Sequence, residues 1–151
     1  MLGVKGIKMT IQVILKNKGA DVVAIDGGLK VAEAVRIMDK RQIGALVVAF
    51  EGQDCSGIFT ERDVMRALAR NGMHILDEPV AAHMTDRPQS VLPETSVQEA
   101  MEIMTQKRFR HLPVMTGSTL CGIISIGDLV NFRIHQTELE ANAMKEYIAT
   151  G

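Results

Sequence analysis

The chain has 151 residues, a formal net charge of −1, and a composition that is 46% hydrophobic, 23% charged and 3% aromatic. This is the composition of an ordinary globular protein, and no apolar run approaches the roughly 18 residues that suggest a membrane-spanning helix. A near-neutral charge with few aromatic rings gives no support to nucleic-acid binding, which needs a basic surface. The N-terminus lacks the apolar segment of a secretory signal, so we expect a cytoplasmic protein.

The first half of the chain predicts a β-α-β-β-α succession after a short lead-in. Residues 11–20 form a helical or irregular lead-in broken by Gly19, and the apolar run 22–25 is typical of a strand. From Val31 the apolar positions recur at i, i+3, i+4 and i+7, which predicts one face of a helix. Two short apolar strands at 45–50 and 56–59 follow, and a second helix begins near Val64.

The same succession recurs after a linker that runs from residue 71 to residue 79. Its predicted elements are, in order, a lead-in at 83–85, a strand at 90–92, a helix at 97–104, a hairpin from 112–115 and 121–124, and a closing helix at 129–134. Beyond them lies a polar stretch with sparse apolar positions at Leu139, Met144 and Ile148. This stretch predicts a helix that either packs on its own core or pairs with a second chain.

The two halves are copies of one another. Adding 66 to the apolar positions 31, 34, 38, 46 and 48 gives the matching apolar positions of the second half, 97, 100, 104, 112 and 114. For Gly57, Thr60 and Asp63 the offset to the matching residue is 65. One residue is therefore lost in a turn between strands, as expected for a duplicated structural unit. The predicted organisation is an N-terminal lead at 1–9, a repeat at 10–72, a linker at 73–79, a second repeat at 80–134 and a helical tail at 135–151.

Two cysteines stand at equivalent places in the repeats, Cys55 and Cys121. Equivalent positions in a duplicated fold indicate a small packing requirement, so we expect neither a disulfide nor a metal site there.

Each repeat closes with a glycine, two apolar residues, a hydroxyl and, three positions later, a carboxylate: Thr60 with Asp63, and Ser125 with Asp128. This spacing is that of a helix capping box, which contributes about 1 kcal/mol to a helix. Ser96 and Glu99 show the same spacing with nothing to suggest a ligand. Alternatively, each hydroxyl sits at a helix N-terminus, where free amides and the helix dipole favour an anion, and the carboxylate can accept hydrogen bonds from a ribose. A nucleoside phosphate would satisfy both groups, with Ile58 and Ile124 beside its base.

These two closing motifs, together with the run from Arg108 to Val114, resemble a tandem pair of cystathionine β-synthase (CBS) domains, the Bateman module. The resemblance covers about residues 10–134 and is that of a stand-alone CBS pair. It implies an α/β (α+β) fold with two β-α-β-β-α repeats about a pseudo-two-fold, and a homodimer. The function implied is non-catalytic: regulatory binding of AMP, ADP, ATP, S-adenosylmethionine, NAD or NADH in clefts between the repeats, with no catalytic cofactor or metal.

Carried over by position, the resemblance also implies the ligand-binding residues. Asp63 and Asp128 would hold ribose hydroxyls, and Thr60 and Ser125 would contact ribose or phosphate. The phosphate partners would be Arg62, Arg110 and His111, since cationic donors make charge-assisted hydrogen bonds to phosphate. Residues flanking the base would be Val23, Ala45, Leu46 and Pro113, with Lys16 and Thr85 closing the edges. Because Arg110 and His111 correspond to Gly44 and Ala45, the two clefts should not bind equally.

Two other functions compete with this one. In the first, the chain is a structural dimer or a protein-interaction dimer with an unidentified protein target, and the hydroxyl–carboxylate pairs only cap helices. In the second, Ser125, His111 and Asp128 form a hydrolytic triad. The triad is disfavoured because no nucleophile elbow surrounds Ser125.

Overall fold

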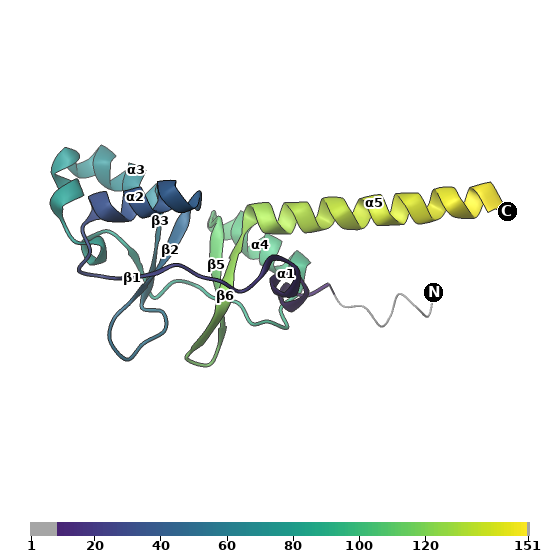
Figure 1. The fold of residues 1–151 in the computed structure, drawn as a ribbon, viewed down its shortest axis with the longest axis horizontal. Helices are drawn as coiled ribbons and strands as arrows, with labels where there is room; N and C mark the ends of the chain where they lie inside the picture. The colour runs from purple at the N-terminus through teal and green to yellow at the C-terminus, as the bar shows by residue number, and fades with distance from the viewer. Residues whose placement is uncertain (1–8, 151) are drawn as a thin grey trace.

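The computed structural model describes residues 9–150, so the predicted N-terminal lead lies outside the described residues except for Met9. The elements in chain order (Figure 1) are α1 (Ile11–Lys18), β1 (Ala24–Asp26), α2 (Val31–Arg41), β2 (Ala45–Ala49), β3 (Gly57–Thr60), α3 (Glu61–Asn71), the short 3₁₀ helices η2 (Met73–Asp77) and η3 (Val80–Ala82), β4 (Thr85–Asp86), α4 (Val97–Lys107), β5 (His111–Thr116), β6 (Thr119–Ser125) and α5 (Ile126–Thr150). The predicted β-α-β-β-α order is confirmed in the first repeat.

The strands form a four-stranded sheet in the order β1-β2-β3-β4 and a separate hairpin of β5 and β6. In the first sheet β1 runs parallel to β2, and the other neighbours are antiparallel. The predicted strand at 90–92 is wrong: only one parallel bridge forms there, between Val91 and Val114. This bridge is the counterpart, 66 positions on, of the pairing of Ile25 with Val48. Pro93, two residues after Val91, has no N–H with which to extend a ladder.

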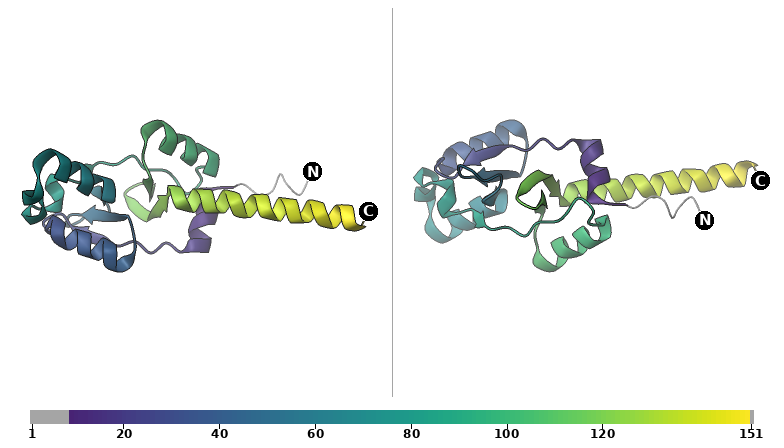
Figure 2. Two further views of the ribbon diagram at one scale, coloured as in Figure 1. Left: turned by 90° about the horizontal axis from the view of Figure 1, so that it is seen from above. Right: turned by 90° about the horizontal axis from the view of Figure 1, so that it is seen from below.

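Each lead-in packs against the other repeat. Helix α1 places Ile11, Ile14 and Leu15 in the core of the second repeat. Conversely, η2 and η3 place Ile75 and Val80 in the core of the first repeat. The ribbons show the same exchange, because α1 lies beside β6 and the start of α5 rather than beside β1 (Figures 1 and 2). Residues 73–79, predicted as a linker, therefore contribute to a core.

Three pairs of equivalent backbone hydrogen bonds hold the exchanged segments in place. The amides of Ile11 and Val80 donate to the carbonyls of Thr95 and Leu29, at 2.9 and 2.8 Å. In the second pair, Gln12 N donates to Pro93 O and Ala81 N donates to Gly27 O. In the third pair, Val97 N donates to Met9 O and Val31 N donates to Glu78 O. These four bonds are each 2.9 Å long. The recurrence of every bond in both repeats is direct evidence of pseudo-two-fold symmetry.

A glycine in the last strand of each repeat, Gly57 at the start of β3 and Gly122 within β6, lies against the incoming lead-in. A Cβ built on Gly57 would lie 2.8 Å from the carbonyl oxygen of Thr85, and one built on Gly122 would lie 2.8 Å from Leu15 Cδ2. Both distances are shorter than any real Cβ contact. At Gly57 the neighbouring atom is backbone, so the crossing of the two segments requires glycine there, whereas at Gly122 the neighbour is the end of the Leu15 side chain.

Helix α5 runs unbroken for 25 residues and extends well beyond the two repeats (Figures 1 and 2). Leu139, Met144 and Ile148 on its outer part are exposed. Of the two alternatives for the tail, the structure excludes packing on its own core, because only the first turns of α5 meet the repeats. Over residues 9–150, no helix combines the length and apolar character needed to cross a membrane.

We expect Gly57→Ala to lower the free energy of unfolding by about 1–3 kcal/mol, since the added methyl group must displace backbone. The matched control is Gly127→Ala in the first turn of α5, where the nearest atom lies 3.6 Å from the new Cβ. Alanine there should leave stability unchanged or raise it by up to about 1 kcal/mol. Urea unfolding of both variants measures the difference, and equal stabilities would refute the crossing argument.

Candidate functional site

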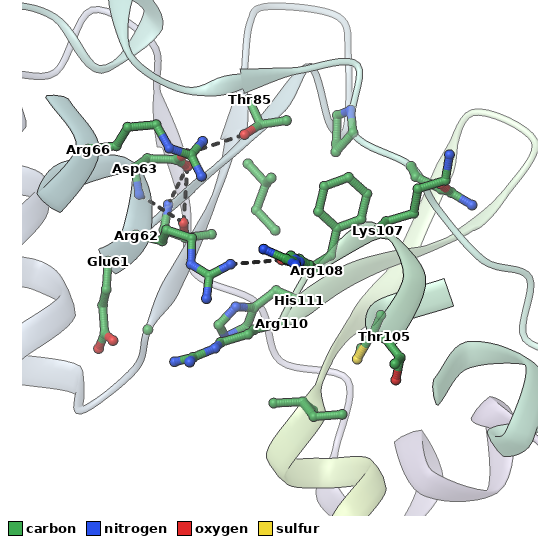
Figure 3. Close-up of a pocket in the computed structure, with 18 residues that line it drawn as sticks. Glu61, Arg62, Asp63, Arg66, Thr85, Thr105, Lys107, Arg108, Arg110 and His111 are labelled. Atoms are coloured by element: carbon green, nitrogen blue, oxygen red, sulfur yellow. Dashed lines mark hydrogen bonds between the residues drawn. The ribbon is translucent and has the colours of Figure 1, made fainter. Parts of the chain in front are cut away.

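A cleft of about 970 Å³ opens between the two repeats (Figure 3). The first repeat contributes the end of β3 and the start of α3, and the second contributes the end of α4 and the start of β5. Its lining residues are Gly44, Ile58, Thr60, Glu61, Arg62, Asp63, Arg66, Thr85, Pro88, Gln89, Met104, Thr105, Lys107, Arg108, Phe109, Arg110, His111 and Ile126. The cleft therefore depends on both repeats and on the exchanged lead-in that carries Thr85.

Asp63 is the one buried acidic residue in the described part of the chain, with 7% of its surface exposed. Its Oδ2 accepts hydrogen bonds from Thr60 N at 2.9 Å and Thr60 Oγ1 at 3.1 Å, and its own amide donates to Thr60 Oγ1 at 3.2 Å. The capping box is thus complete. Among the described residues, Oδ1 receives only a long contact of 3.4 Å from Thr85 Oγ1. One carboxylate oxygen caps the helix and the other retains capacity to accept hydrogen bonds in the cleft.

The cleft is strongly cationic. Its lining contains five cations, Arg62, Arg66, Lys107, Arg108 and Arg110, against two carboxylates, Glu61 and Asp63, which gives +3 when His111 is neutral. The whole chain carries −1. A concave site with this local excess attracts an anion.

Two features hold the cationic segment across the cleft. Arg62 Nη1 donates to the carbonyl oxygen of Arg108 at 2.9 Å and so links α3 to the end of α4. Arg108 ends α4 in the left-handed conformation, with φ of 59°. This turn directs the following residues, Phe109 and Arg110, into the lining of the cleft.

His111 begins β5 and pairs with Ser125 across the hairpin. Burial lowers the pKa of His111, and the positive charges of Lys18 and Arg110 act in the same direction, while Glu61 and Asp128 oppose them. The imidazole is therefore neutral at pH 7. It can take up a proton when an anion enters the cleft.

The equivalent carboxylate of the second repeat already has a cation beside it. Asp128 Oδ2 accepts a hydrogen bond from Ser125 N at 2.8 Å, and Asp128 N donates to Ser125 Oγ at 3.1 Å, which completes a second capping box. Lys18 Nζ from α1 donates to Asp128 Oδ2 at 2.7 Å and to the carbonyl oxygen of Ile123 at 2.9 Å. Burial alone would raise the pKa of Asp128, but the Lys18 ammonium and the Ser125 amide hold it below its ordinary value.

The structure places the predicted site residues in three groups. Six line the cleft: Thr60, Arg62, Asp63, Thr85, Arg110 and His111. Ser125 and Asp128 lie at the second site with Lys18, whereas Lys16 is exposed on α1. The four base-flanking residues, Val23, Ala45, Leu46 and Pro113, do not line the cleft. Leu46 is fully buried in the first core, and Pro113 lies buried in the β5–β6 ladder.

Sequence reasoning missed several lining residues, above all Arg66, Lys107, Arg108 and Phe109. Two signals were available. Arg66 follows Arg62 by one helical turn, so both side chains share a face of α3. Residues 107–110 read Lys-Arg-Phe-Arg, a cationic run interrupted only by a ring.

The residues of the alternative triad are engaged elsewhere. Ser125 Oγ is an acceptor for the Asp128 amide, and the hydrogen bonds of the described residues include none from His111 to Ser125 or Asp128 side chains.

Both cysteines are free thiols, and burial raises the pKa of Cys55.

Two repeats with exchanged lead-ins around a shared polar cleft define a duplicated repeat pair. The family model described as the CBS domain matches residues 15–70 and again residues 80–135, and the chain belongs to this family. The resemblance expected from the closing motifs is thereby confirmed.

Similar proteins come from plants and bacteria. The mitochondrial CBS domain-containing protein CBSX3 of Arabidopsis thaliana is 35% identical over 153 aligned residues, which cover 94% of this chain and 73% of CBSX3. A crystal structure of a CBS-domain containing protein from Agrobacterium tumefaciens is 39% identical, with a TM-score of 0.79 over 82% of this chain and 98% of that one. A Burkholderia ambifaria protein described as a signal-transduction protein with CBS domains is 38% identical, with a TM-score of 0.77 over 83% and 94% of the two chains.

We expect Lys18→Met to lower the free energy of unfolding by about 1 kcal/mol at pH 7, because Asp128 loses a charge-assisted partner. Since the folded pKa of Asp128 is depressed, this contribution is complete above about pH 4 and is lost as the pH falls through the folded pKa. Carboxyl NMR titration should show the pKa of Asp128 rising in the variant.

The control for this prediction is Lys16→Met, two residues earlier on the same helix and exposed. An Asp128 titration that is the same in both variants and the wild type would contradict the assignment of Lys18.

Proposed function

We propose that the chain is a non-catalytic regulatory module that binds an anionic adenosine ligand, of the AMP, ATP or NAD(H) type, in the cleft at Asp63. One observation carries this proposal: a buried carboxylate with a spare acceptor oxygen lies beside five cations in a cleft of about 970 Å³. A ribose phosphate needs a carboxylate for its hydroxyl groups and cations for its phosphate, and the two must lie within the length of one ligand. CBS-pair proteins are regulatory or signalling proteins as a class, which supports the same conclusion.

The lining suggests how such a ligand would lie. The ribose hydroxyls would donate to Asp63 Oδ1, beside Thr85. The phosphates would meet Arg110 and neighbouring cations at the end of α4, where guanidinium groups offer paired donors. Ile58 is almost fully buried at the cleft wall and gives the base an apolar surface.

The net charge of the cleft favours phosphorylated ligands over sulfonium ligands. The CBS pair of the protein MJ0100 has been solved in complex with 5′-methylthioadenosine and S-adenosyl-L-methionine, but it is only 20% identical to this chain, with a TM-score of 0.75. That likeness shows the fold alone. A +3 lining repels the sulfonium and ammonium of S-adenosylmethionine and attracts a diphosphate, so ADP, ATP or NADH should bind more tightly.

The two clefts should be unequal, with one nucleotide bound per chain. At the second site the Lys18 ammonium already occupies an oxygen of Asp128 that a ribose would use. A ligand there would have to displace a short ion pair before making its own contacts.

Regulation follows from the cleft's position between repeats. A ligand that contacts both Asp63 and Arg110 stabilises one mutual arrangement of the repeats over others. The shift in population is limited by the difference in affinity between the arrangements. A homodimer is the expected assembly; a 31% identical CBS-CP12 protein from bloom-forming cyanobacteria is described as hexameric, with a TM-score of 0.73.

The test is isothermal titration calorimetry with AMP, ADP, ATP, NADH and S-adenosylmethionine on protein stripped of carried-over nucleotide. We expect one phosphorylated ligand per chain, and at least a tenfold loss of affinity in Asp63→Asn, because a buried carboxylate-to-hydroxyl hydrogen bond is lost. Asp128→Asn is the matched control and should bind normally. If no adenosine ligand binds the folded protein, the capping boxes are purely structural and the interaction-dimer function is favoured.

We expect nucleotide binding to be accompanied by proton uptake at His111. The pKa of the free imidazole is lowered, and a bound anion raises it, so affinity increases as the pH falls toward and below about 6.5. Titrations in buffers of different ionisation enthalpy measure the uptake.

His111→Gln should abolish the imidazole's share of this uptake. Comparing it with the wild type for one ligand cancels the protonation of the ligand's own phosphate. If the number of protons taken up on binding is the same in the variant and the wild type, His111 does not contact the phosphate.

A further inference from the structure

The outer part of α5 carries a seam of regularly spaced side chains. Alternating steps of four and three residues connect Val130, Ile134, Thr137, Ala141, Met144 and Ile148. This is the heptad spacing of a coiled coil, in which positions a and d face a partner helix. We call these six residues the α5 seam.

The α5 seam is exposed and does not face the repeats. Its large members Val130, Ile134, Met144 and Ile148 are 40%, 53%, 64% and 71% exposed. Leu129, which is fully buried, marks the side of α5 that meets the second core. At about 100° per residue, the seam lies roughly a third of a turn from that side, so a second helix has access to it.

The charges beside the seam specify the partner and its direction. In heptad terms, Arg133 and Glu140 occupy g positions, and Glu138 and Lys145 occupy e positions. In a parallel, in-register pair of identical helices, each g residue faces the e residue five positions on in the other helix. Arg133 then meets Glu138 and Glu140 meets Lys145, so all four contacts across the seam are between opposite charges.

An antiparallel pair would instead bring like residues together, with g facing g and e facing e. Centred on the middle heptad, it would place Glu140 against Glu140. Among residues 9–150, none of the four flanking charges forms an ion pair. None of them has an opposite charge three or four residues away on its own helix either. These four charges therefore have no oppositely charged partner within the described part of one chain.

We propose that the α5 seam binds the α5 seam of a second copy of this chain as a parallel two-stranded coiled coil. Isoleucine at two of the three a positions supplies large apolar side chains for burial in such a pair. A projecting helix of this length is marginally stable without a partner, which the second copy would supply.

Sedimentation equilibrium of the full chain tests the proposal by charge reversal and rescue. The wild type should dimerise. Glu138→Lys and Arg133→Glu, each of which turns two symmetric attractions into repulsions, should weaken the dimer about tenfold or more. The double variant restores opposite charges and should return to within about threefold of the wild type.

The matched control is Glu146→Lys, which makes the same charge change at an exposed position on the far side of α5. It should leave the dissociation constant within about threefold. A monomeric wild type, or a dimer insensitive to all of these variants, would overturn the proposal and point to another occupant or another face.

Direction is tested by cysteine crosslinking. Thr137→Cys places identical residues opposite each other in a parallel pair, close enough for a disulfide, so oxidation should yield a covalent dimer. Glu146→Cys should not crosslink, and the wild type with Cys55 and Cys121 sets the background. Crosslinking at 146 but not at 137 would contradict the seam.

Discussion

The structure depends on the exchange of lead-in segments between the two repeats. Neither repeat can complete its core alone, since α1 supplies Ile11 and Ile14 to the second core while Ile75 and Val80 belong to the first. Six equivalent backbone hydrogen bonds fix the exchange, and Gly57 and Gly122 give it room. The same segments also bring Thr85 to Asp63 and Lys18 to Asp128. The constraint that folds the chain is therefore also the one that assembles both candidate sites from different parts of the sequence.

The difference between the two sites arises from a small difference between the lead-ins. By the symmetry of the backbone bonds, Thr85 corresponds to Lys16. However, Thr85 lies in a short strand paired with β3, whereas the chain remains helical through Lys18. The helix carries Lys18, rather than Lys16, to the second carboxylate. The cleft at Asp63 has a spare carboxylate oxygen and a +3 lining, whereas Asp128 is paired with a lysine of the chain itself. A duplicated fold has thus acquired two unequal sites.

Much of this could be predicted from the sequence, because the repeat constrains both copies at once. Apolar periodicity gave the helices and the hairpin, and the glycine–hydroxyl–carboxylate motif located Asp63 and Asp128 at helix starts. The strand at 90–92 was predicted from a short apolar run without regard to Pro93, which has no N–H to continue the ladder. The base-flanking assignments relied on position alone, and no local pattern shows that Leu46 points into a core rather than a cleft. Lys18 was missed because its role depends on which segment crosses which repeat, whereas the helical spacing of Arg66 from Arg62 was a local signal that was not used.

The most direct test of the account is a crystal structure of the protein grown with saturating ADP. The account predicts one nucleotide per chain, with its ribose on Asp63 and its phosphates among the cations at residues 107–111, while the Lys18–Asp128 pair remains intact. A nucleotide bound at Asp128 with Lys18 displaced, while the Asp63 cleft stays empty, would contradict it.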